Sequence, residues 1–280
     1  MNRRRQASAR SLAGGLGTVF SRDIATGGLD YFDYQMRVAR DVLLPWLRAR
    51  IRLDGAKVAD FGCHAGGTIA VLRESEVDAA VGVEINEAVV EASPLVQDDR
   101  FRIVVGDLTA LDDAAASFDL VLLHDVLEHV VDCDSVLDVV RRSLRPGGHG
   151  FVSFPPYRAA FGGHQFLASG PARHVPYVHY VPDSVFRRLI RPADNEYMSG
   201  SDTLNDILSV RRTRLSLDRA ERAFARAGLV PVDQELFVLR PEFTIRYGMP
   251  TMGAGALGRV RGVREVLVNG AFYLLGARAG

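Results

Sequence analysis

Three acidic side chains stand at the ends of three successive apolar segments of this chain. Asp60 closes the segment KVAD, Glu84 closes VGVE and Asp107 closes FRIVVGD, and the glycine-rich turn DFGCHAGGT begins at Asp60. One interpretation is that each acid only caps a following helix. Their coincidence with the glycine-rich turn instead favours a nucleoside-shaped ligand, because backbone N–H groups approach the ligand at such a turn and a carboxylate one strand later accepts hydrogen bonds from a ribose.

The turn departs from a pure glycine pattern at one position, His64. The turn survives if the φ angle of this residue is negative and its ring points away, and histidine is also among the residues that tolerate left-handed geometry. We expect the backbone of His64 to follow the ligand while the ring points elsewhere. The alternative, in which the ring enters the site itself, stays open.

Histidines supply candidate bases, because the pKa of imidazole lies near neutrality. His164 in GGHQ is the first candidate and His179, flanked by tyrosines, is the second; His129 in VLEHV is the third. Each is also compatible with a histidine that only holds a loop in place. No paired carboxylate spacing accompanies these histidines, so we expect no bound metal.

The segment around these histidines also carries side chains that suit an acceptor molecule. Phe161, Phe166, Tyr177 and Tyr180 are compatible with an apolar acceptor pocket, or equally with a small core of the segment's own. Arg173 suits an anionic group on the substrate, and the alternative is a solvated surface arginine.

Alternating strands and helices position these groups. Strands are predicted at 57–62, 77–84, 101–107, 117–125, 149–156, 229–239 and 271–277, and helices at 31–51, 67–74, 86–93, 134–144 and 217–227. Pro45 should kink or end the first helix, and RPGG should end the fourth. This order predicts a doubly wound, mostly parallel α/β sheet, with ligands at the carboxyl ends of its strands. Residues 157–215 interrupt the rhythm and are predicted to form a lid.

Composition narrows the class of protein further. The chain has 280 residues with 34 basic and 34 acidic side chains, so no overall positive field favours nucleic acid. Its two cysteines, Cys63 and Cys133, form neither a disulfide framework nor a zinc motif, which favours the cytoplasm. No apolar stretch approaches a membrane span. We expect a flexible tail over 1–28 and one domain over 29–280, and we leave peripheral membrane contact and a homo-oligomer open.

Five motifs carry a resemblance to a known family. In order and spacing, VADFGCHAGG, VGVEIN, VVGDL, FDLVLLHDVLEHV and LRPGGHGFVSFP resemble the motifs of the class I S-adenosylmethionine-dependent methyltransferases, over about residues 57–156. The resemblance implies a Rossmann-like sheet of seven strands, the last of them antiparallel. It also implies S-adenosylmethionine as the cofactor.

The resemblance implies a role for each strand end. The loop from Phe61 to Gly66 would wrap the methionine part of the cofactor, Glu84 would hold the ribose, and Asp107 would bind the adenine amino group. The cofactor-binding residues implied in this way, together with the acid that opens the turn, are Asp60, Phe61, Gly62, His64, Gly66, Glu84, Ile85, Asp107, Leu108, His124 and Asp125.

The expected reaction is methyl transfer to a small molecule, with the hydroxyl of a natural product or sugar as the favoured acceptor. Two other functions remain as alternatives. His64 motivates a methyltransferase fold that binds without catalysing. An NAD-dependent oxidoreductase is disfavoured by Asp60, because a carboxylate in the turn would repel a pyrophosphate.

Overall fold

A single mixed sheet organises the chain. The computed structural model describes residues 29–108, 116–191, 194 and 200–278, so the tail predicted over 1–28 lies outside the described residues. The strands are β1 Lys57–Phe61, β2 Ala79–Glu84, β3 Phe101–Val105, β4 Phe118–His124, β5 Leu144–Phe154, β6 Leu229–Leu239, β7 Met252–Gly253 and β8 Gly270–Ala277.

The strand order is β3-β2-β1-β4-β5-β8-β6-β7. Strands β1 to β5 pair in parallel, and β8 runs antiparallel between β5 and β6. The doubly wound, mostly parallel α/β fold is therefore confirmed, and so is the strand interpretation of the C-terminal segment. The predicted count of seven strands was wrong, because a two-residue strand, β7, adds an eighth at the edge by pairing with β6. So short a strand leaves no periodic pattern in the sequence.

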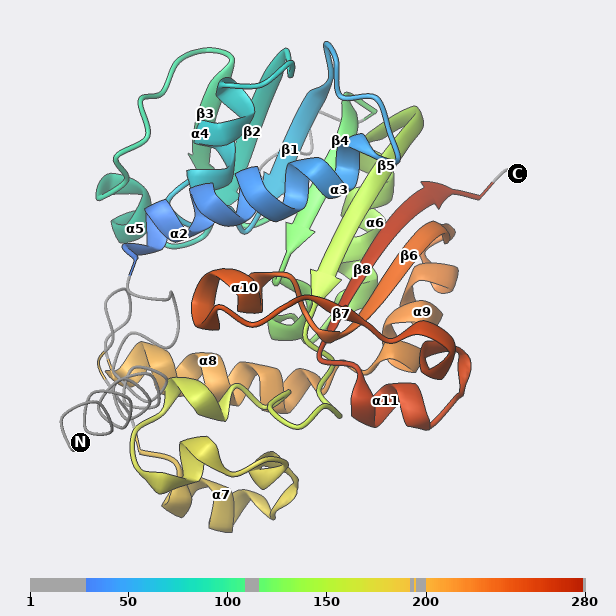
Figure 1. Cartoon of the computed structure of the whole chain (residues 1–280). Coiled ribbons are helices and arrows are strands. Elements are labelled where there is room, and N and C mark those ends of the chain that lie inside the picture. The colour runs from blue at the N-terminus through green and yellow to red at the C-terminus, as the bar shows by residue number, and fades with distance from the viewer. Residues whose placement is uncertain (1–28, 109–115, 192–193, 195–199, 279–280) are drawn as a thin grey trace, which may run out of the picture.

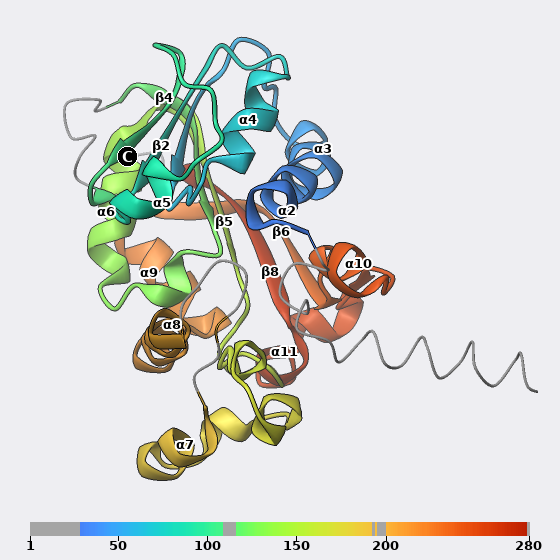
Figure 2. The same cartoon turned by 90° about the vertical axis from the view of Figure 1, so that its left-hand side faces the viewer.

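Helices cover both faces of the sheet (Figures 1 and 2). Because side chains alternate along a strand, Val58, Leu120 and Leu122 join one core cluster while Ala59 and Val121 join the other. On the first face lie α2 (Tyr31–Val38), the π-helical turn η2 (Ala39–Leu43), α3 (Leu44–Arg48) and α4 (Gly67–Arg73); on the second lie α6 (Cys133–Ser143) and α9 (Leu217–Arg226).

Pro45 lies inside a continuous helical segment and does not end it. The chain stays right-handed helical from α2 through α3 to Arg48. The amide of Leu44 donates to the carbonyl of Ala39, five residues earlier, within the wider turn η2. A π-helical turn rearranges the backbone bonding next to the proline, which has no N–H to donate. The helix therefore passes Pro45 and reaches the sheet.

The fourth predicted helix ends as expected, but the following strand begins earlier than predicted. α6 ends at Ser143, and β5 starts at Leu144 and includes RPGG. The register against β4 jumps from Phe118–Leu144 to Leu120–His149, which marks an irregularity of the ladder at this place. Gly147 adopts a φ of 80° there. The Pro and Gly residues of RPGG therefore lie in an irregular part of β5 that follows directly on α6.

The segment 157–215 forms a small unit of its own beside the sheet (Figure 1). It contains the 3-10 turns η5 (Gln165–Leu167), η6 (Pro171–His174) and η7 (Val178–Tyr180) and the helices α7 (Asp183–Leu189) and α8 (Gly200–Thr213). Its core consists of Ala168, Ala172, Val178, Phe186, Ile190 and Ile207. The remaining short elements are α5 (Glu87–Glu91), η4 (Leu127–His129), α10 (Glu242–Tyr247), η8 (Gly255–Arg259) and α11 (Val263–Leu267).

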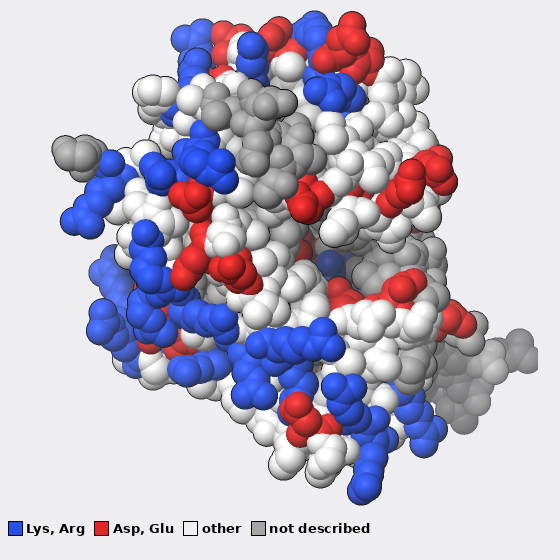
Figure 3. All heavy atoms as spheres, turned by 180° about the vertical axis from the view of Figure 1, so that it is seen from behind, with Lys and Arg blue, Asp and Glu red and all other residues white. Residues whose placement is uncertain are grey.

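The balanced charge of the chain is unevenly spread over its surface. On the face opposite to Figure 1, Lys and Arg side chains gather over the lower half, while both signs mix in the upper half (Figure 3). Exposed arginines of α6 and α9 include Arg141, Arg142, Arg222 and Arg226. None of the described helices is long and apolar enough to cross a membrane.

Candidate active site

A cavity of about 560 Å³ opens at the carboxyl ends of β1, β2 and β4, and we call it the strand-end cavity. This is the edge of a doubly wound sheet at which ligands bind, next to the point where the strand order reverses. Of the expected cofactor-binding residues it is lined by Asp60, Gly62, His64, Glu84, Ile85, His124 and Asp125.

The glycines of the first turn are required by close contacts. Gly62 and Gly66 adopt φ angles of 75° and 81°, in the left-handed region. A Cβ atom on Gly62 would lie 2.6 Å from Val126, and one on Gly67 would lie 2.5 Å from the carbonyl oxygen of Phe32. The turn thus packs closely against Val126, just before η4, on one side and against helix α2 on the other.

His64 adopts a left-handed backbone with a φ of 51°, so the turn survives through the tolerance of histidine for this region rather than through a negative φ. Its amide donates to Glu84 Oε2 at 2.9 Å. Its ring packs edge-on against Tyr31 of α2, with centroids 4.4 Å apart, and burial lowers the pKa of the imidazole. The ring therefore turns toward α2, while the residue still lines the strand-end cavity.

Glu84 is the last residue of β2, and its carboxylate connects the loop after β1 with the loop after β2. Oε2 accepts from the amide of His64 and Oε1 accepts from the amide of Asn86, both at 2.9 Å. A carboxylate has about four acceptor positions, so each oxygen keeps lone-pair capacity toward the cavity. This geometry suits a pair of neighbouring hydroxyl groups, such as those of a ribose.

Asp60 is a buried acid that faces the same cavity. Its side chain is 3% exposed and accepts no hydrogen bond from the described residues. Burial raises the pKa of Asp60 to about 7; nearby His124 opposes this shift and Glu84 adds to it. A cationic group in the strand-end cavity would stabilise the ionised form of this carboxyl.

A smaller apolar cavity of about 350 Å³ adjoins the first, since Gly62, Glu84 and Ile85 line both. Asp107 and Leu108 line its other side. Ile85 is 75% exposed although it is a large apolar residue. Apolar walls with a carboxylate at the edge suit a planar base that carries an amino group.

Two expected residues line none of these cavities. Phe61 is fully buried in the core cluster on the α6 face, so only its backbone belongs to the turn. Gly66 is the N-cap of α4 and allows the chain to turn toward Ile103 and Leu95. Both residues therefore support the turn from the side that faces the core, away from the cavities.

A buried ionic network supports the end of β4. Arg240 donates to both oxygens of Asp125, at 2.9 and 2.8 Å, and to both oxygens of Glu242. His124 Nε2 lies 3.4 Å from Glu242 Oε1. Burial opposes ionisation of Asp125 and Glu242, but the Arg240 guanidinium lowers the pKa of both. The network links the strand-end cavity to α10.

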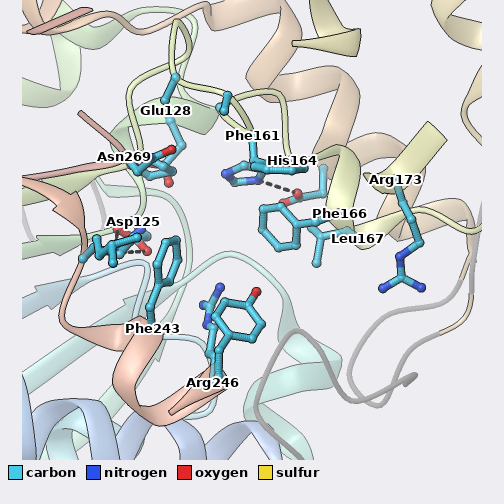
Figure 4. Close-up of a pocket in the computed structure, with 18 of the residues that line it drawn as sticks. Asp125, Glu128, Phe161, His164, Phe166, Leu167, Arg173, Phe243, Arg246 and Asn269 are labelled. Atoms are coloured by element: carbon cyan, nitrogen blue, oxygen red, sulfur yellow. Dashed lines mark hydrogen bonds and ion pairs between the residues drawn. The ribbon is translucent and has the colours of Figure 1, made fainter. Parts of the chain in front are cut away.

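A third cavity, of about 480 Å³, lies between the segment 157–215 and α10, and we call it the lid cavity. Figure 4 shows Phe161, Phe166 and Leu167 on the lid side and Phe243 on the opposite side. The lid and strand-end cavities share Tyr31, Asp125, His129, Asp206 and Arg246, so they adjoin.

Two histidines of the expected set meet at the lid cavity. His129 lines both cavities and His164 lines the lid cavity, with ring centroids 5.2 Å apart. Asp206 of α8 reaches both Nδ1 atoms: Oδ2 lies 3.1 Å from His164 and Oδ1 lies 3.4 Å from His129. Burial opposes ionisation of Asp206, but the two imidazoles lower the pKa of the carboxyl.

The hydrogen bonds assign the proton on His129. Ser209 Oγ donates to the carbonyl of Asp206, so at 2.8 Å it accepts from Nδ1–H of His129. Nε2 of His129 then carries the lone pair, and burial lowers the pKa of the ring. An imidazole oriented in this way can accept a proton.

Glu128 lies beside these histidines and is 1% exposed. Neither of its side-chain oxygens has a hydrogen-bond partner, and Oε1 lies 3.8 Å from His129 Nε2. Burial, and next the charge of Asp125, raise the pKa of Glu128 well above its usual range. Glu128, His129 and His164 present ligand-type atoms within 4.8 Å of one another, a grouping that the sequence spacing did not reveal.

His179 lies apart from this cluster. It is 1% exposed, its Nε2 contacts the carbonyl oxygen of Tyr157 at 2.8 Å, and burial lowers its pKa to about 4. Neither large cavity includes it. Tyr177 and Tyr180 are exposed, whereas Phe161 and Phe166 line the lid cavity. Two of the four aromatic residues thus line the lid cavity and two face solvent, and other side chains form the core of the segment 157–215.

The sequence did not reveal several residues of the site. Gln35 of α2 accepts from the amide of Gly67 and donates to the carbonyl of Cys63, which clamps the turn. Asp206 and Ser209 orient the histidines, and Arg240 and Glu242 support β4. These residues lie in segments far from the motifs, and no spacing rule connects them to the strand ends.

Comparison with known proteins finds methyltransferases. Residues 59–152 match a family model described as a methyltransferase domain. The chain is 31% identical over 113 residues to the ubiquinone biosynthesis O-methyltransferase of Pseudomonas entomophila, an alignment that covers 39% of this chain and 48% of that relative. It is 29% identical over 188 residues to the enzyme of the same name from Thiobacillus denitrificans, covering 62% and 80%. The chain thus spans about half the length of the first relative.

Solved structures show the same fold. An S-adenosylmethionine-dependent methyltransferase from Mesorhizobium loti superposes with a TM-score of 0.50 at 20% identity, covering 82% of this chain and 95% of that one. Phosphoethanolamine N-methyltransferase 2 of Haemonchus contortus, in complex with S-adenosylhomocysteine, gives a TM-score of 0.51 at 16% identity, covering 86% and 53%.

Proposed function

This chain belongs to the class I S-adenosylmethionine-dependent methyltransferases, and we propose that it transfers a methyl group from S-adenosylmethionine to a hydroxyl oxygen of a small molecule. The observation that carries the proposal is the shared wall of the two large cavities, where His129 and Asp125 face both. The strand-end cavity is the proposed cofactor site and the lid cavity the proposed acceptor site.

The residues present fit this cofactor. Asp60 offers a buried carboxyl for the ammonium group, Glu84 offers acceptor positions for the ribose hydroxyls, and Ile85 and Leu108 offer apolar contact for the adenine. When bound, S-adenosylmethionine supplies a methyl group on a positively charged sulfur. The protein binds and orients both reactants and limits the access of water.

His129 is the proposed base. Its Nε2 is unprotonated in the assigned tautomer, and the ring stands at the junction of the cavities. Asp206 stabilises the imidazolium that forms when Nε2 takes the hydroxyl proton. His164, the first candidate from the sequence, shares Asp206 but lines only the lid cavity, so we assign it to contact with the acceptor.

The walls of the lid cavity favour an acceptor with an apolar body. Phe161, Phe166, Leu167, Phe243 and Met249 line it, and aromatic side chains of this kind suit an aromatic or lipid-like natural product better than a sugar. Among hydroxyls, a phenol with a pKa near 10 gives up its proton to an imidazole more readily than an alcohol does. The names of the bacterial relatives, which are O-methyltransferases, also support oxygen as the acceptor atom.

Two measurements test this function. Isothermal titration with S-adenosylhomocysteine should show saturable binding, and an absence of heat at millimolar concentration would exclude the cofactor site. Incubation with methyl-labelled S-adenosylmethionine and a panel of phenols, alcohols and amines should label the phenols. Labelling of amines alone would contradict the assignment of oxygen.

Within the described residues, no structural observation favours the two alternative functions. A turn collapsed over the cleft would support a non-catalytic module, whereas the described residues leave the strand-end cavity open. The family assignment replaces the NAD-dependent interpretation. Cys63 and Cys133 are buried and free, which suits the reducing cytoplasm in which we place this reaction.

A further inference from the structure

Arg173 is the only one of the three arginines lining the lid cavity whose side chain makes no hydrogen bond or ion pair in the described part of the structure. Arg240 is saturated by Asp125 and Glu242. Arg246 donates to the hydroxyl of Tyr34 and lies 4.9 Å from the centre of that ring. The guanidinium of Arg173 makes no hydrogen bond or ion pair within the described residues, and its Nε is buried.

Arg173 is not the solvated surface arginine that the sequence left open. Its side chain is half-buried, and burial lowers the pKa of its guanidinium. It belongs to the short turn η6, and its neighbour Ala172 is anchored in the lid core. Figure 4 shows Arg173 beside Leu167, on the far side of the cavity from Asp125.

The acidic residues of the cavity do not pair with Arg173, because two of them face other cationic or imidazole groups and the third favours its neutral form. Asp125 pairs with Arg240, and Asp206 faces His129 and His164. Glu128 sits in surroundings that favour its neutral form. A partly desolvated arginine whose donors lack acceptors pairs favourably with an anion, and the planar guanidinium matches carboxylate and phosphate oxygens.

We propose that the acceptor carries an anionic group, a carboxylate or a phosphate, that pairs with Arg173 while its apolar body lies against Phe166, Leu167 and Phe243. This inference rests on the proposed function, since it describes the molecule that the lid cavity receives. It restricts the acceptor class to amphipathic acids: a hydroxyl at the His129 end and an anion at the η6 end.

The test compares an acidic acceptor analogue with its neutral amide, and adds a phosphate ester as a second anion. Protein loaded with S-adenosylhomocysteine is titrated with 3,4-dihydroxycinnamate, with the neutral amide of that acid, and with 4-hydroxyphenyl phosphate. A charge-assisted contact predicts that an anion binds about 10- to 100-fold more tightly than the amide. The anion that binds more tightly indicates whether the anionic group of the acceptor is a carboxylate or a phosphate.

Variants assign the effect to one residue. R173Q should abolish the preference for the anion, and R173K should keep part of it, because it retains charge without the planar fork. R188Q, which removes an exposed arginine of α7 in the same lid, should keep all of it. R173K also provides a folded comparison if R173Q does not fold, and a thermal transition checks both.

The outcomes separate this inference from the proposed function. Equal affinity for acid and amide, binding of neither, or a preference that survives in R173Q would overturn the inference even if S-adenosylhomocysteine binds. The same titrations are repeated without S-adenosylhomocysteine. An Arg173-dependent preference in protein that never binds S-adenosylhomocysteine would leave the anion site standing and overturn only the methyl transfer.

Discussion

The two cavities are built in different ways. The acidic side chains that line the strand-end cavity from the sheet lie at the ends of β1, β2 and β4 or just after them, at Asp60, Glu84 and Asp125, while α2 and α8 supply other parts of its wall. The lid cavity combines η4, the segment 159–174, α8 and α10, which lie far apart in the sequence. The sheet therefore places the acids of the first cavity, whereas most of the second cavity depends on how an insertion folds against the sheet.

This difference predicts how each region responds to substitution. Changes at strand ends should weaken cofactor binding, because each side chain acts on the ligand from a rigid strand. Changes in the lid cavity should reduce turnover or acceptor binding while cofactor binding persists. The Arg240 network, which contacts both regions, should affect the stability of the whole fold.

The largest expected effect is on turnover. His129→Gln should reduce turnover by about 10²- to 10⁴-fold, the usual contribution of a general base, while S-adenosylhomocysteine still binds. His149→Gln, a change at a half-buried histidine of β5 that lines neither large cavity, is the matched control. Because burial lowers the pKa of His129, kcat at saturating S-adenosylmethionine should be retained as pH falls to 6.5 and decline only below it. Steady-state kinetics across pH measures both effects.

Two results would contradict a base at His129. One is normal turnover in the glutamine variant. The other is loss of wild-type turnover in the presence of EDTA, which would mean that Glu128, His129 and His164 hold a metal ion instead.

The second largest effect is expected on folding stability, at the Arg240 network that connects the two cavities. Arg240→Met leaves Asp125 and Glu242 buried without their cation, which should cost about 3–5 kcal/mol of unfolding free energy. Adding Glu242→Gln should restore part of that loss. Arg226→Met removes an exposed pair with Asp134 and should leave the denaturation midpoint unchanged. Urea unfolding followed by circular dichroism measures all three, and equal midpoints would show that the network is not structural.

A smaller effect is expected at the ribose position. Glu84→Ala should weaken S-adenosylhomocysteine binding by about 100-fold, because the ribose contacts and the acceptors for the amides of His64 and Asn86 are lost together. Glu87→Ala, three residues away and exposed, is the control and should bind normally. Isothermal titration compares the two. Retained affinity in the Glu84 variant would place the ribose elsewhere.

The smallest effect is a pH dependence of binding. The Asp60 carboxyl has a pKa of about 7 and is mostly protonated below that value, so binding a cation there must release the proton. Affinity for S-adenosylhomocysteine should therefore be constant above pH 7 and fall by up to about tenfold per pH unit below it. Titrations from pH 5.5 to 8.5 measure this profile.

Asp60→Asn should flatten the profile, and Asp41→Asn, at an exposed acid of η2, should not. The raised pKa also means that ionised Asp60 reduces folding stability as pH rises from 4 to 7. The asparagine variant should therefore be at least as stable at pH 8 as the wild type. An unchanged pH profile in this variant would remove Asp60 from the cofactor site.

The sequence alone determined most of the sheet and the acids at its strand ends. Strand and helix periodicity, the Gly62–Gly67 turn and the acids at the strand ends are local patterns, since each depends on a few adjacent residues. In a parallel sheet all carboxyl ends meet at one edge, so local patterns suffice to bring Asp60 and Glu84 together.

Only the tertiary structure decided the lid cavity. The roles of Asp206, Ser209 and Arg173 depend on where a nonperiodic insertion packs, and that packing comes from contacts between residues tens of positions apart. The partners of Asp125 and the short strand β7 likewise follow from the return of the C-terminal segment across the sheet. Such contacts arise from the shape of the assembled core, which no local spacing encodes.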